Sequence, residues 1–321
     1  MAALPEWSET RVVDLRKISA DDLGPLLEEE TLAWKAALRW DLQPSANLVR
    51  RFVRMQALNG FALLHRARVI GYAYYVLEDY KGLIGDLYIL ERERTPDRER
   101  NLIHACVDAM LRTPGIRRLE TQFLLSTSVT DEKMPYAHLL RRFPRWYLQI
   151  RSADALRLEA RELQGVETAP WLESCRDDAA RLIASAYQGH IDSEINDQYR
   201  SAAGSRRFLN NIIEYPGCGA FFGPASLAAL DRRTGALCGL SLTSLIAPDS
   251  GHLTQLCVSP AHQGLGVGYE LLRRSLILLA GHGCRTVSLT VTAANSGAIQ
   301  LYEAMGFKRH RAFQAHVWEL Q

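Results

Sequence analysis

The chain has 321 residues, of which 47% are hydrophobic and 23% charged, and its formal net charge at pH 7 is +2. This composition is typical of a globular protein with about two domains. The small net charge argues against a protein that mainly coats nucleic acid, which usually has a strongly basic domain. Apolar runs such as that at 276–281 are far shorter than the ~20 residues that cross a membrane.

The N-terminal residues and the cysteines indicate which cellular compartment and which kinds of site to expect. Residues 1–11 contain acidic side chains and no apolar segment, so they do not resemble a secretory signal, and we expect a cytoplasmic protein. The six cysteines are spread along the chain without a C-x-x-C pair. This spacing predicts neither a zinc site nor a disulfide framework, and we therefore expect no metal.

Hydrophobic periodicity in the first half predicts a mixed order of strands and helices. The elements expected there are a strand at 11–18, helices at about 22–39 and 47–56, and strands at 60–66, 69–79 and 82–90. They are followed by a helix around 102–110, a strand at 117–125, a helix at 131–143 and a strand at 146–156.

The second half repeats this order. The elements expected are a strand at 165–171, helices at 175–187 and 197–213, strands at 220–231, 236–246 and 252–258, a helix up to 280, a strand at 285–292, a helix from 295 and a strand at 308–320. Two halves with one order indicate an internal repeat. We place the boundary in the charged stretch 157–166, which gives domains at 1–156 and 157–321.

The most informative stretch runs from His252 to Gly268 and reads HLTQLCVSPAHQGLGVG. It begins as a strand, with alternation predicting one face of His252, Thr254, Leu256 and Val258 and an opposite face of Leu253, Gln255 and Cys257. A proline ends the strand, and a glycine-rich turn then leads into a helical pattern. Such a turn favours an anion, because first-turn N–H groups and the helix dipole point at it.

This stretch resembles the coenzyme A pyrophosphate motif of the GNAT superfamily, the acyl-CoA-dependent N-acyltransferases. A second match lies at 285–307, which reads RTVSLTVTAANSGAIQLYEAMGF. The glycine spacing is neither that of the Rossmann fingerprint nor that of a Walker loop. The resemblance implies an α/β fold with two GNAT-like domains in tandem. Each domain would be a twisted, mainly antiparallel sheet flanked by helices, with one splayed strand pair, and acetyl-CoA would be the co-substrate.

By the same resemblance, the fourth strand of the second domain carries a bulge, and its unpaired N–H groups bind the pantetheine arm and the thioester. Those groups would belong to Leu256, Cys257 and Val258. The pyrophosphate would lie on the main-chain N–H groups of Gln263, Gly264, Leu265, Gly266, Val267, Gly268 and Tyr269. Arg273 and Arg274 would either hold the 3′-phosphate or form a solvated helix face.

Two side chains are candidates for the catalytic chemistry. Tyr302 matches the family's tyrosine that protonates the departing thiolate, which a neutral phenol can do at pH 7. Asn295 is expected to cap the same helix, and in the family this position contacts the coenzyme or its acyl group. His252 is a candidate general base, because an ordinary histidine accepts protons near neutral pH.

Alternatives remain open for the base and for the route. Asp192, Glu194 and Asp197 lie in the loop that usually covers the acceptor site, or they are ordinary surface charges. Cys257 could take the acyl group covalently, but no neighbouring histidine in the sequence would activate it. The resemblance implies direct transfer within a ternary complex instead.

The N-terminal half matches the family in element order only. When Leu87 is laid over Leu256, Arg94 falls opposite Gln263, Asp97 opposite Gly266 and Glu99 opposite Gly268. Side chains and like charges would then oppose a pyrophosphate. We expect this half to be a degenerate domain that serves as a scaffold or as a wall of the acceptor pocket.

The prediction is therefore an N-acetyltransferase that acts on a primary amine of a small-molecule acceptor. The tandem architecture resembles that of mycothiol synthases, which acetylate an amino group on a cysteine conjugate. No nucleic acid or membrane partner is expected, and the sequence does not predict the oligomeric state. The alternative is an acyl-CoA sensor that keeps the site without catalysing transfer.

Overall fold

The computed structural model describes residues 10–125 and 134–320, and these form two compact units. The N-terminal unit comprises the chain up to Leu38, Leu42–Phe143 and the residues from Phe313 onward. The C-terminal unit comprises Arg39–Asp41 and Pro144–Ala312. The units thus differ from two consecutive halves of the chain. The domain boundary predicted between residues 156 and 157 stays a prediction.

Strand pairing explains why the units are not consecutive. The end of β13 (Lys308–Glu319) pairs with β5 (Arg118–Gln122) in the N-terminal unit. The greater part of β6 (Leu140–Arg151) pairs with β12 (Thr286–Thr292) in the C-terminal unit. The last strand of each sequence half therefore completes the sheet of the other unit.

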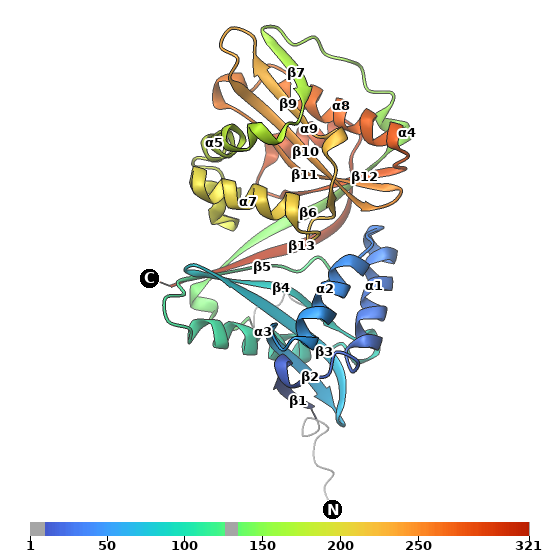
Figure 1. The fold of residues 1–321 in the computed structure, drawn as a ribbon, viewed down its shortest axis with the longest axis vertical. Coiled ribbons are helices and arrows are strands. Elements are labelled where there is room, and N and C mark those ends of the chain that lie inside the picture. Colours follow the sequence, from blue (N-terminus) through green and yellow to red (C-terminus); the bar gives the residue numbers. More distant parts are fainter. Residues whose placement is uncertain (1–9, 126–133, 321) are drawn as a thin grey trace, which may run out of the picture. The chain divides into compact units, whose positions relative to one another are not determined.

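The N-terminal unit is a mainly antiparallel sheet with three α-helices among its described residues (Figure 1). Its strand order is β1-β2-β3-β4-β5-β13, and only β4 and β5 run parallel. The remaining elements are β1 (Thr10–Asp14), α1 (Gly24–Leu38), α2 (Gln43–Arg54), β2 (Asn59–His65), β3 (Arg68–Glu78), β4 (Lys81–Ile89) and α3 (Pro96–Leu111).

The C-terminal unit has the sheet order β6-β12-β11-β10-β9-β7, with the short β8 on β10, and only β11 and β12 run parallel. Its strands include β7 (Val166–Pro170), β8 (Ala220–Phe221), β9 (Leu227–Asp231), β10 (Leu237–Ala247) and β11 (Ser250–Val258). Its helices are α4 (Ser152–Ala155), α5 (Arg176–Ala186), α6 (Asp192–Ile195), α7 (Ala202–Glu214), α8 (Val267–His282) and α9 (Ser296–Ala304).

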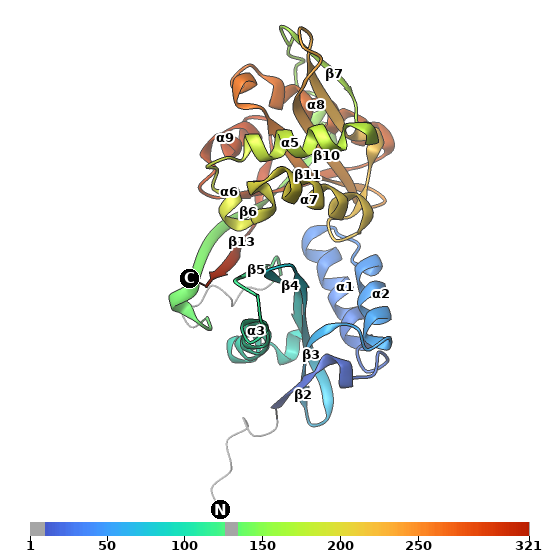
Figure 2. The same ribbon diagram turned by 60° about the vertical axis from the view of Figure 1, so that its left-hand side comes forward.

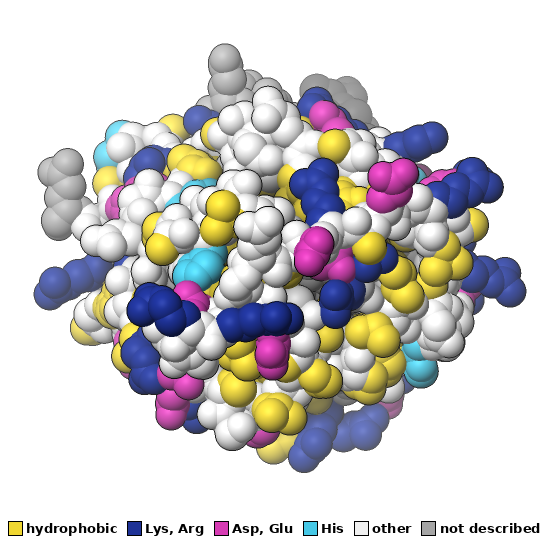
Figure 3. Space-filling model, turned by 90° about the horizontal axis from the view of Figure 1, so that it is seen from above, with side chains coloured by type: hydrophobic (Ala, Val, Ile, Leu, Met, Phe, Trp, Pro, Cys, Tyr) yellow, Lys and Arg dark blue, Asp and Glu magenta, His cyan; other side chains and the backbone are white. Residues whose placement is uncertain are grey.

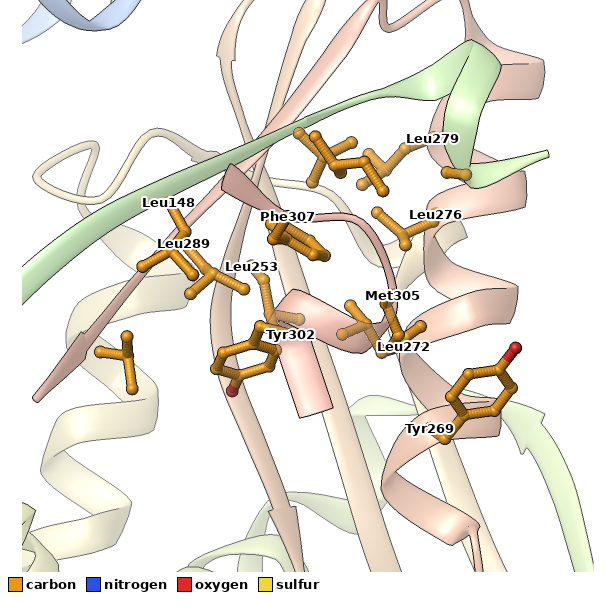
Figure 4. Packing of buried hydrophobic residues seen from close by; sticks show 14 of the residues in the cluster. Leu148, Leu253, Tyr269, Leu272, Leu276, Leu279, Leu289, Tyr302, Met305 and Phe307 are labelled. Carbon is orange, nitrogen blue, oxygen red and sulfur yellow. The ribbon is translucent and has the colours of Figure 1, made fainter. Parts of the chain in front are cut away.

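Two hydrophobic clusters cover the faces of this sheet. Helices α5 and α7 contact one another and pack on Leu240, Leu242 and Cys257 (Figure 2). Helices α8 and α9 pack in a separate cluster that includes Leu253 and Leu289 (Figure 4). Burial of these apolar faces, at roughly 25 cal/mol per Å² removed from water, holds the helices on the sheet.

Several predicted elements differ from the structure. The helix expected at 131–143 is wrong where residues are described, because Leu140 already begins β6, which then ends at Arg151 before α4. Its residues 131–133 lie outside the described part. Pairing along β12 decides this strand, which local periodicity could not show. The strand expected at 220–231 is split into β8 and β9 around the turn Gly223–Ala225, whose Pro224 cannot donate to a ladder.

The helix expected at 197–213 begins later, at α7. Ser201 caps it by accepting a hydrogen bond from the N–H of Gly204 (3.0 Å), and Asp197–Arg200 form a 3-10 turn instead. Among the helices of the described ranges, none has the length and apolar character to cross a membrane.

Candidate functional site

Strand β11 contains a β-bulge. Leu242 of β10 lies opposite Gln255, whereas the next residue, Thr243, lies opposite Leu253. Thr254 is therefore the extra residue, and its Oγ1 donates to the carbonyl oxygen of Leu242 (2.9 Å). The bulge predicted from the resemblance is confirmed.

The bulge also changes which side chains share a face. Leu253 packs in the cluster of α8 and α9, whereas Cys257 packs in the cluster of α5 and α7. Simple alternation along β11 had put these two side chains on one face, so that prediction is wrong. The extra residue reverses the alternation beyond Thr254.

Strands β11 and β12 separate immediately before the bulge. Their parallel pairing covers Ser250–Leu253 against Thr286–Leu289 and then stops, although β12 remains paired with β6 up to Thr292. The edge of β11 beyond Leu253 is consequently not paired with β12. This is the splayed strand pair that the resemblance implied.

The open edge of β11 presents two of the three predicted N–H groups. Ser259 donates its N–H to the carbonyl oxygen of Cys238 on β10 (2.8 Å). Alternate residues of a strand direct their N–H groups to the same side, so that of Cys257 also faces β10. The N–H groups of Leu256 and Val258 face the open edge, and the prediction for Cys257 is corrected accordingly.

The turn after β11 begins with the 3-10 segment Pro260–His262 and leads to α8. Gly264 (φ 77°) and Gly266 (φ 82°) both adopt the left-handed backbone conformation that favours glycine. A Cβ atom on Gly264 would meet nothing within 4 Å. Gly266 is the N-cap of α8, and no side chain caps this helix end. The first N–H groups of α8 are thus available to an anion.

The side chains around the turn have different roles. Gln263 donates from Nε2 to the carbonyl oxygen of Val258 (3.2 Å), and Leu265 is 59% exposed. Val267 is buried in the core. A Cβ atom on Gly268 would lie 3.5 Å from the side chain of Val258, which is an ordinary contact distance. Any contribution of Val267 and Gly268 to binding would come from the main chain.

Tyr302 and Asn295 lie on α9, as predicted. Asn295 caps the helix, since its Oδ1 accepts a hydrogen bond from the N–H of Ala298 (3.2 Å). Tyr302 is buried, and its hydroxyl points away from Phe307 and Met305 in the view of Figure 4. Burial, and secondarily the negative charge of Asp192, raises the pKa of this phenol, so Tyr302 is neutral at pH 7.

His252 lies in surroundings that do not suit a general base. It is 5% exposed, in the paired part of β11 before the bulge. Its ring lies near those of Trp40 and Tyr147, and Nδ1 is 2.9 Å from Oγ of Ser288. Burial lowers the pKa of His252 to about 4, which makes the neutral imidazole a weak proton acceptor. The structure gives the prediction of His252 as base no support.

Asp192 is better placed than His252 to accept a proton near Tyr302. It begins α6, and its Oδ1 accepts a hydrogen bond from Oγ1 of Thr292 at the end of β12. Its main-chain N–H donates to Nδ1 of His190 (3.1 Å). The negative charge of Asp192 contributes to the raised pKa of Tyr302, so the carboxylate lies within electrostatic range of the phenol. Glu194 forms an ion pair with Arg200, and Asp197 is buried.

The sequence analysis did not identify a cluster of polar and aromatic side chains around Gln255. Gln255, 3% exposed, donates from Nε2 to the hydroxyl of Tyr187 (3.0 Å) and accepts at Oε1 from the hydroxyl of Tyr199 (3.4 Å). The two tyrosine rings stack with centroids 4.4 Å apart, and the ring of His190 meets Tyr187 edge-on. These residues come from the turn after α5, the 3-10 turn Asp197–Arg200 and strand β11, so no local motif indicates that they meet.

Comparison with known proteins supports this interpretation. Residues 187–307 match the model of the acetyltransferase (GNAT) family. We refer to this matched segment, residues 187–307, as the GNAT domain. The matched range includes the bulged strand, the glycine turn and Tyr302, whereas α5, β6 and Trp40 lie outside it.

Curated relatives of the GNAT domain include mycothiol acetyltransferases. The one from Thermomonospora curvata is 37% identical over 90 residues, which are 28% of this chain and 30% of the relative. The one from Kocuria rhizophila is 30% identical over 167 residues, which are 50% of this chain and 52% of the relative. The matches thus span between about a third and a half of these relatives.

Solved structures share the fold of the whole chain. A GCN5-related N-acetyltransferase from Sphaerobacter thermophilus has a TM-score of 0.68 at 17% identity, covering 99% of this chain and 97% of that one. A tandem GNAT protein from the clavulanic acid biosynthesis pathway has a TM-score of 0.65 at 18% identity, covering 97% and 98%. The predicted tandem GNAT fold is confirmed.

Proposed function

We propose that the GNAT domain transfers an acetyl group from acetyl-CoA to a primary amine of a small acceptor, by direct transfer in a ternary complex. The observation that carries this proposal is the uncapped start of α8 directly beyond the open edge of β11. The start of α8 would receive the diphosphate of the coenzyme. The open edge of β11 would offer the N–H groups of Leu256 and Val258 to the thioester oxygen.

Preorganised main-chain donors suit this reaction. When the amine attacks the thioester carbonyl, negative charge develops on the carbonyl oxygen. Donors that a bulge already leaves unpaired can stabilise this charge without reorganising at the moment of reaction. The chain therefore provides electrostatic stabilisation mainly from its backbone, and side chains are needed mainly for proton transfer.

We assign the proton transfers to Asp192 and Tyr302. Asp192 accepts the proton that the attacking nitrogen loses, and Tyr302 donates its proton to the sulfur as the carbon–sulfur bond breaks. The products are an amide and free coenzyme A, and a proton passing from Asp192 through solvent to Tyr302 restores the starting state. Thr292 holds the carboxylate of Asp192 in place. This assignment replaces His252 as the proton acceptor.

Turnover is the direct test. The purified protein is incubated with acetyl-CoA and a panel of amines that includes cysteine conjugates, as the mycothiol relatives suggest, and free thiol is measured. We expect thiol release that depends on the amine. Coenzyme binding without thiol release for any amine would instead favour the acyl-CoA sensor.

Matched variants test the assigned roles. Tyr302→Phe should lower kcat by about 100-fold or more, since a positioned general acid contributes at least that much. Tyr215→Phe changes an exposed tyrosine in the same unit and should leave kcat unchanged.

Asp192→Asn should also lower kcat by about 100-fold or more, because it removes the proposed proton acceptor. Asp178→Asn, which changes an exposed aspartate, is its control. Full activity of the Asp192 variant together with loss in His252→Gln would restore His252 as the base.

A further inference from the structure

The charged stretch between the predicted domains is not a free linker. The hydroxyl of Tyr269 donates to the carbonyl oxygen of Glu159 (2.9 Å), and the main-chain N–H of Arg161 donates to Oε2 of Glu270 (3.1 Å). Leu163 packs against the cluster that contains Val267. Residues 159–163 are therefore attached at several points to the first turns of α8.

This attachment brings one cation to the glycine turn. The guanidinium carbon of Arg161 lies 3.9 Å from the ring centroid of Tyr269. Its Cδ would be 3.7 Å from a Cβ atom on Gly266, the N-cap of α8. The Arg161 side chain is exposed, and within residues 10–125 and 134–320 no carboxylate forms an ion pair with it.

The other two arginines near this helix start are already engaged. Arg273 binds both carboxylate oxygens of Glu270 (2.8 and 2.7 Å), and Arg274 binds the same carboxylate (2.8 Å) and Thr168. Burial of Glu270 opposes its charge, but these hydrogen bonds outweigh burial and lower its pKa to about 2. Arg273 and Arg274 thus act in the structure as partners of a buried carboxylate.

The local charge favours an anion beside the turn. Two guanidiniums face the single carboxylate of Glu270, and the positive charge of Arg161 is additional. On the face of the molecule shown in Figure 3, basic and acidic side chains are interspersed rather than gathered into a field of one sign. Attraction of a phosphate would therefore depend on individual groups close to it.

We propose that Arg161 is a phosphate-binding residue of the coenzyme site, supplied by the segment that connects the two sequence halves. The inference rests on the proposed acetyl-CoA site, in which the diphosphate would otherwise be bound by main-chain N–H groups. A guanidinium can bind a phosphate through two parallel N–H donors. Stacking on Tyr269 holds the group beside Gly266 and reduces the entropy lost on binding. The phosphate is either the diphosphate or the 3′-phosphate.

Isothermal titration with coenzyme A and with dephospho-coenzyme A, which lacks the 3′-phosphate, tests this inference. The variant is Arg161→Met, because an unbranched apolar chain keeps the packing on Tyr269 and removes the charge. Arg157→Met is the matched control, an exposed arginine of the same stretch. We expect Arg161→Met to weaken coenzyme A binding about 10-fold relative to the control.

The two ligands distinguish the phosphates. Equal weakening for both would assign Arg161 to the diphosphate, and weakening for coenzyme A alone would assign it to the 3′-phosphate. Arg161→Glu should bind more weakly than Arg161→Met, because it places a negative charge at the same point.

Two further outcomes would count against the inference in distinguishable ways. Equal affinity of Arg161→Met and Arg157→Met, in a wild-type protein that binds coenzyme A, would overturn the role of Arg161 alone. Absence of binding by the wild-type protein would overturn the proposed function, and this inference with it.

Discussion

The two units distort their sheets in the same way. In the N-terminal unit, Tyr74 lies opposite Asp86 and Tyr75 opposite Ile84, so Gly85 is the extra residue of a bulge in β4. The parallel pairing of β4 with β5 ends at Ile84. The C-terminal unit has its bulge at Thr254 and its separation after Leu253. The strand geometry on which an acyl-CoA site depends is therefore present twice.

The helix starts that follow these strands differ. Helix α3 is capped by Thr95, whose Oγ1 accepts a hydrogen bond from the N–H of Arg98 (3.3 Å). Glu99 is buried in its first turn and forms an ion pair with Arg94 (3.7 Å). Helix α8 instead begins at the uncapped Gly266. The comparison teaches that a splayed sheet and an anion site are separable, because a few side chains decide whether the helix start is free.

The largest effect is expected when the C-terminal turn is given the N-terminal arrangement. In Gly266→Asp the new carboxylate can cap the first N–H groups of α8 and places a negative charge where a diphosphate would bind. We expect the Kd for acetyl-CoA, measured by titration calorimetry, to rise about 100-fold or more, since charge-assisted hydrogen bonds are lost together.

A matched glycine separates this effect from backbone strain. Gly235 has a similar left-handed conformation (φ 70°), in the turn between β9 and β10. Gly235→Asp therefore carries the same conformational cost and should bind acetyl-CoA normally. An unchanged Kd for Gly266→Asp would show that the start of α8 does not hold the coenzyme.

The second prediction concerns stability. Trp318 at the end of β13 is fully buried in the N-terminal unit and donates from Nε1 to the carbonyl oxygen of Pro135 (2.8 Å). Trp318→Ala should destabilise this unit by about 3–5 kcal/mol, the usual cost of removing a buried large side chain. Hydrogen exchange of the β5 amides should become faster while the acetyl-CoA affinity stays unchanged. A parallel loss of affinity would show that coenzyme binding depends on the N-terminal unit.

A smaller, pH-dependent effect is expected from Asp86. Burial raises its pKa from the ordinary 3.8 to about 6, and the neighbouring Glu30 is buried as well. The folded state then binds more protons than the unfolded state between pH 4 and 6, so this group lowers the stability as the pH rises through that range. Asp86→Asn should remove this loss, which is on the order of 2 kcal/mol.

Denaturant unfolding at pH 4 and at pH 7 measures the difference between the wild-type protein and this variant. The comparison cancels the opposite trend of groups such as Glu270, whose lowered pKa adds stability above pH 4.5. A stability difference that does not change with pH would show that Asp86 titrates normally in the folded state.

The smallest expected effect concerns Cys257. Burial raises the pKa of its thiol to about 12, so almost no thiolate exists at neutral pH. Incubation with acetyl-CoA without an acceptor should leave this residue unacetylated, as seen by mass spectrometry of the peptide that contains it. A stoichiometric acetyl adduct on Cys257 would favour a covalent route over direct transfer.

Much of the architecture was predictable from local patterns. Turn signals and periodicity placed β2, β3 and β4 within one or two residues, because hydrophobic alternation and turn chemistry are local. The start of β6 was not predictable, since this strand depends on pairing with β12, far along the chain. The prediction of which β11 side chains share a face was wrong for a related reason, because the extra residue Thr254 reverses the alternation beyond it.

The residues of the candidate site also fall into those that the sequence predicted and those that it did not. The glycine turn, Asn295 and Tyr302 were found from the sequence, because their spacing along the chain is itself the signal. Gln255, Tyr187 and Tyr199 were missed, since their hydrogen bonds join residues more than 50 positions apart. His252 was chosen for its ordinary pKa, and burial, which only the fold decides, lowers that pKa.

The amino-acid sequence by itself indicated the GNAT resemblance of the C-terminal half and the turn that would receive a diphosphate, because glycines at a set spacing favour a particular backbone conformation locally. Only the tertiary structure decided that each sheet is completed by a strand from the other half of the sequence. It likewise decided that Asp192 approaches Tyr302 and that Arg161 lies beside Gly266. Pairing, burial and charge proximity depend on residues distant in the chain, and no local pattern encodes them.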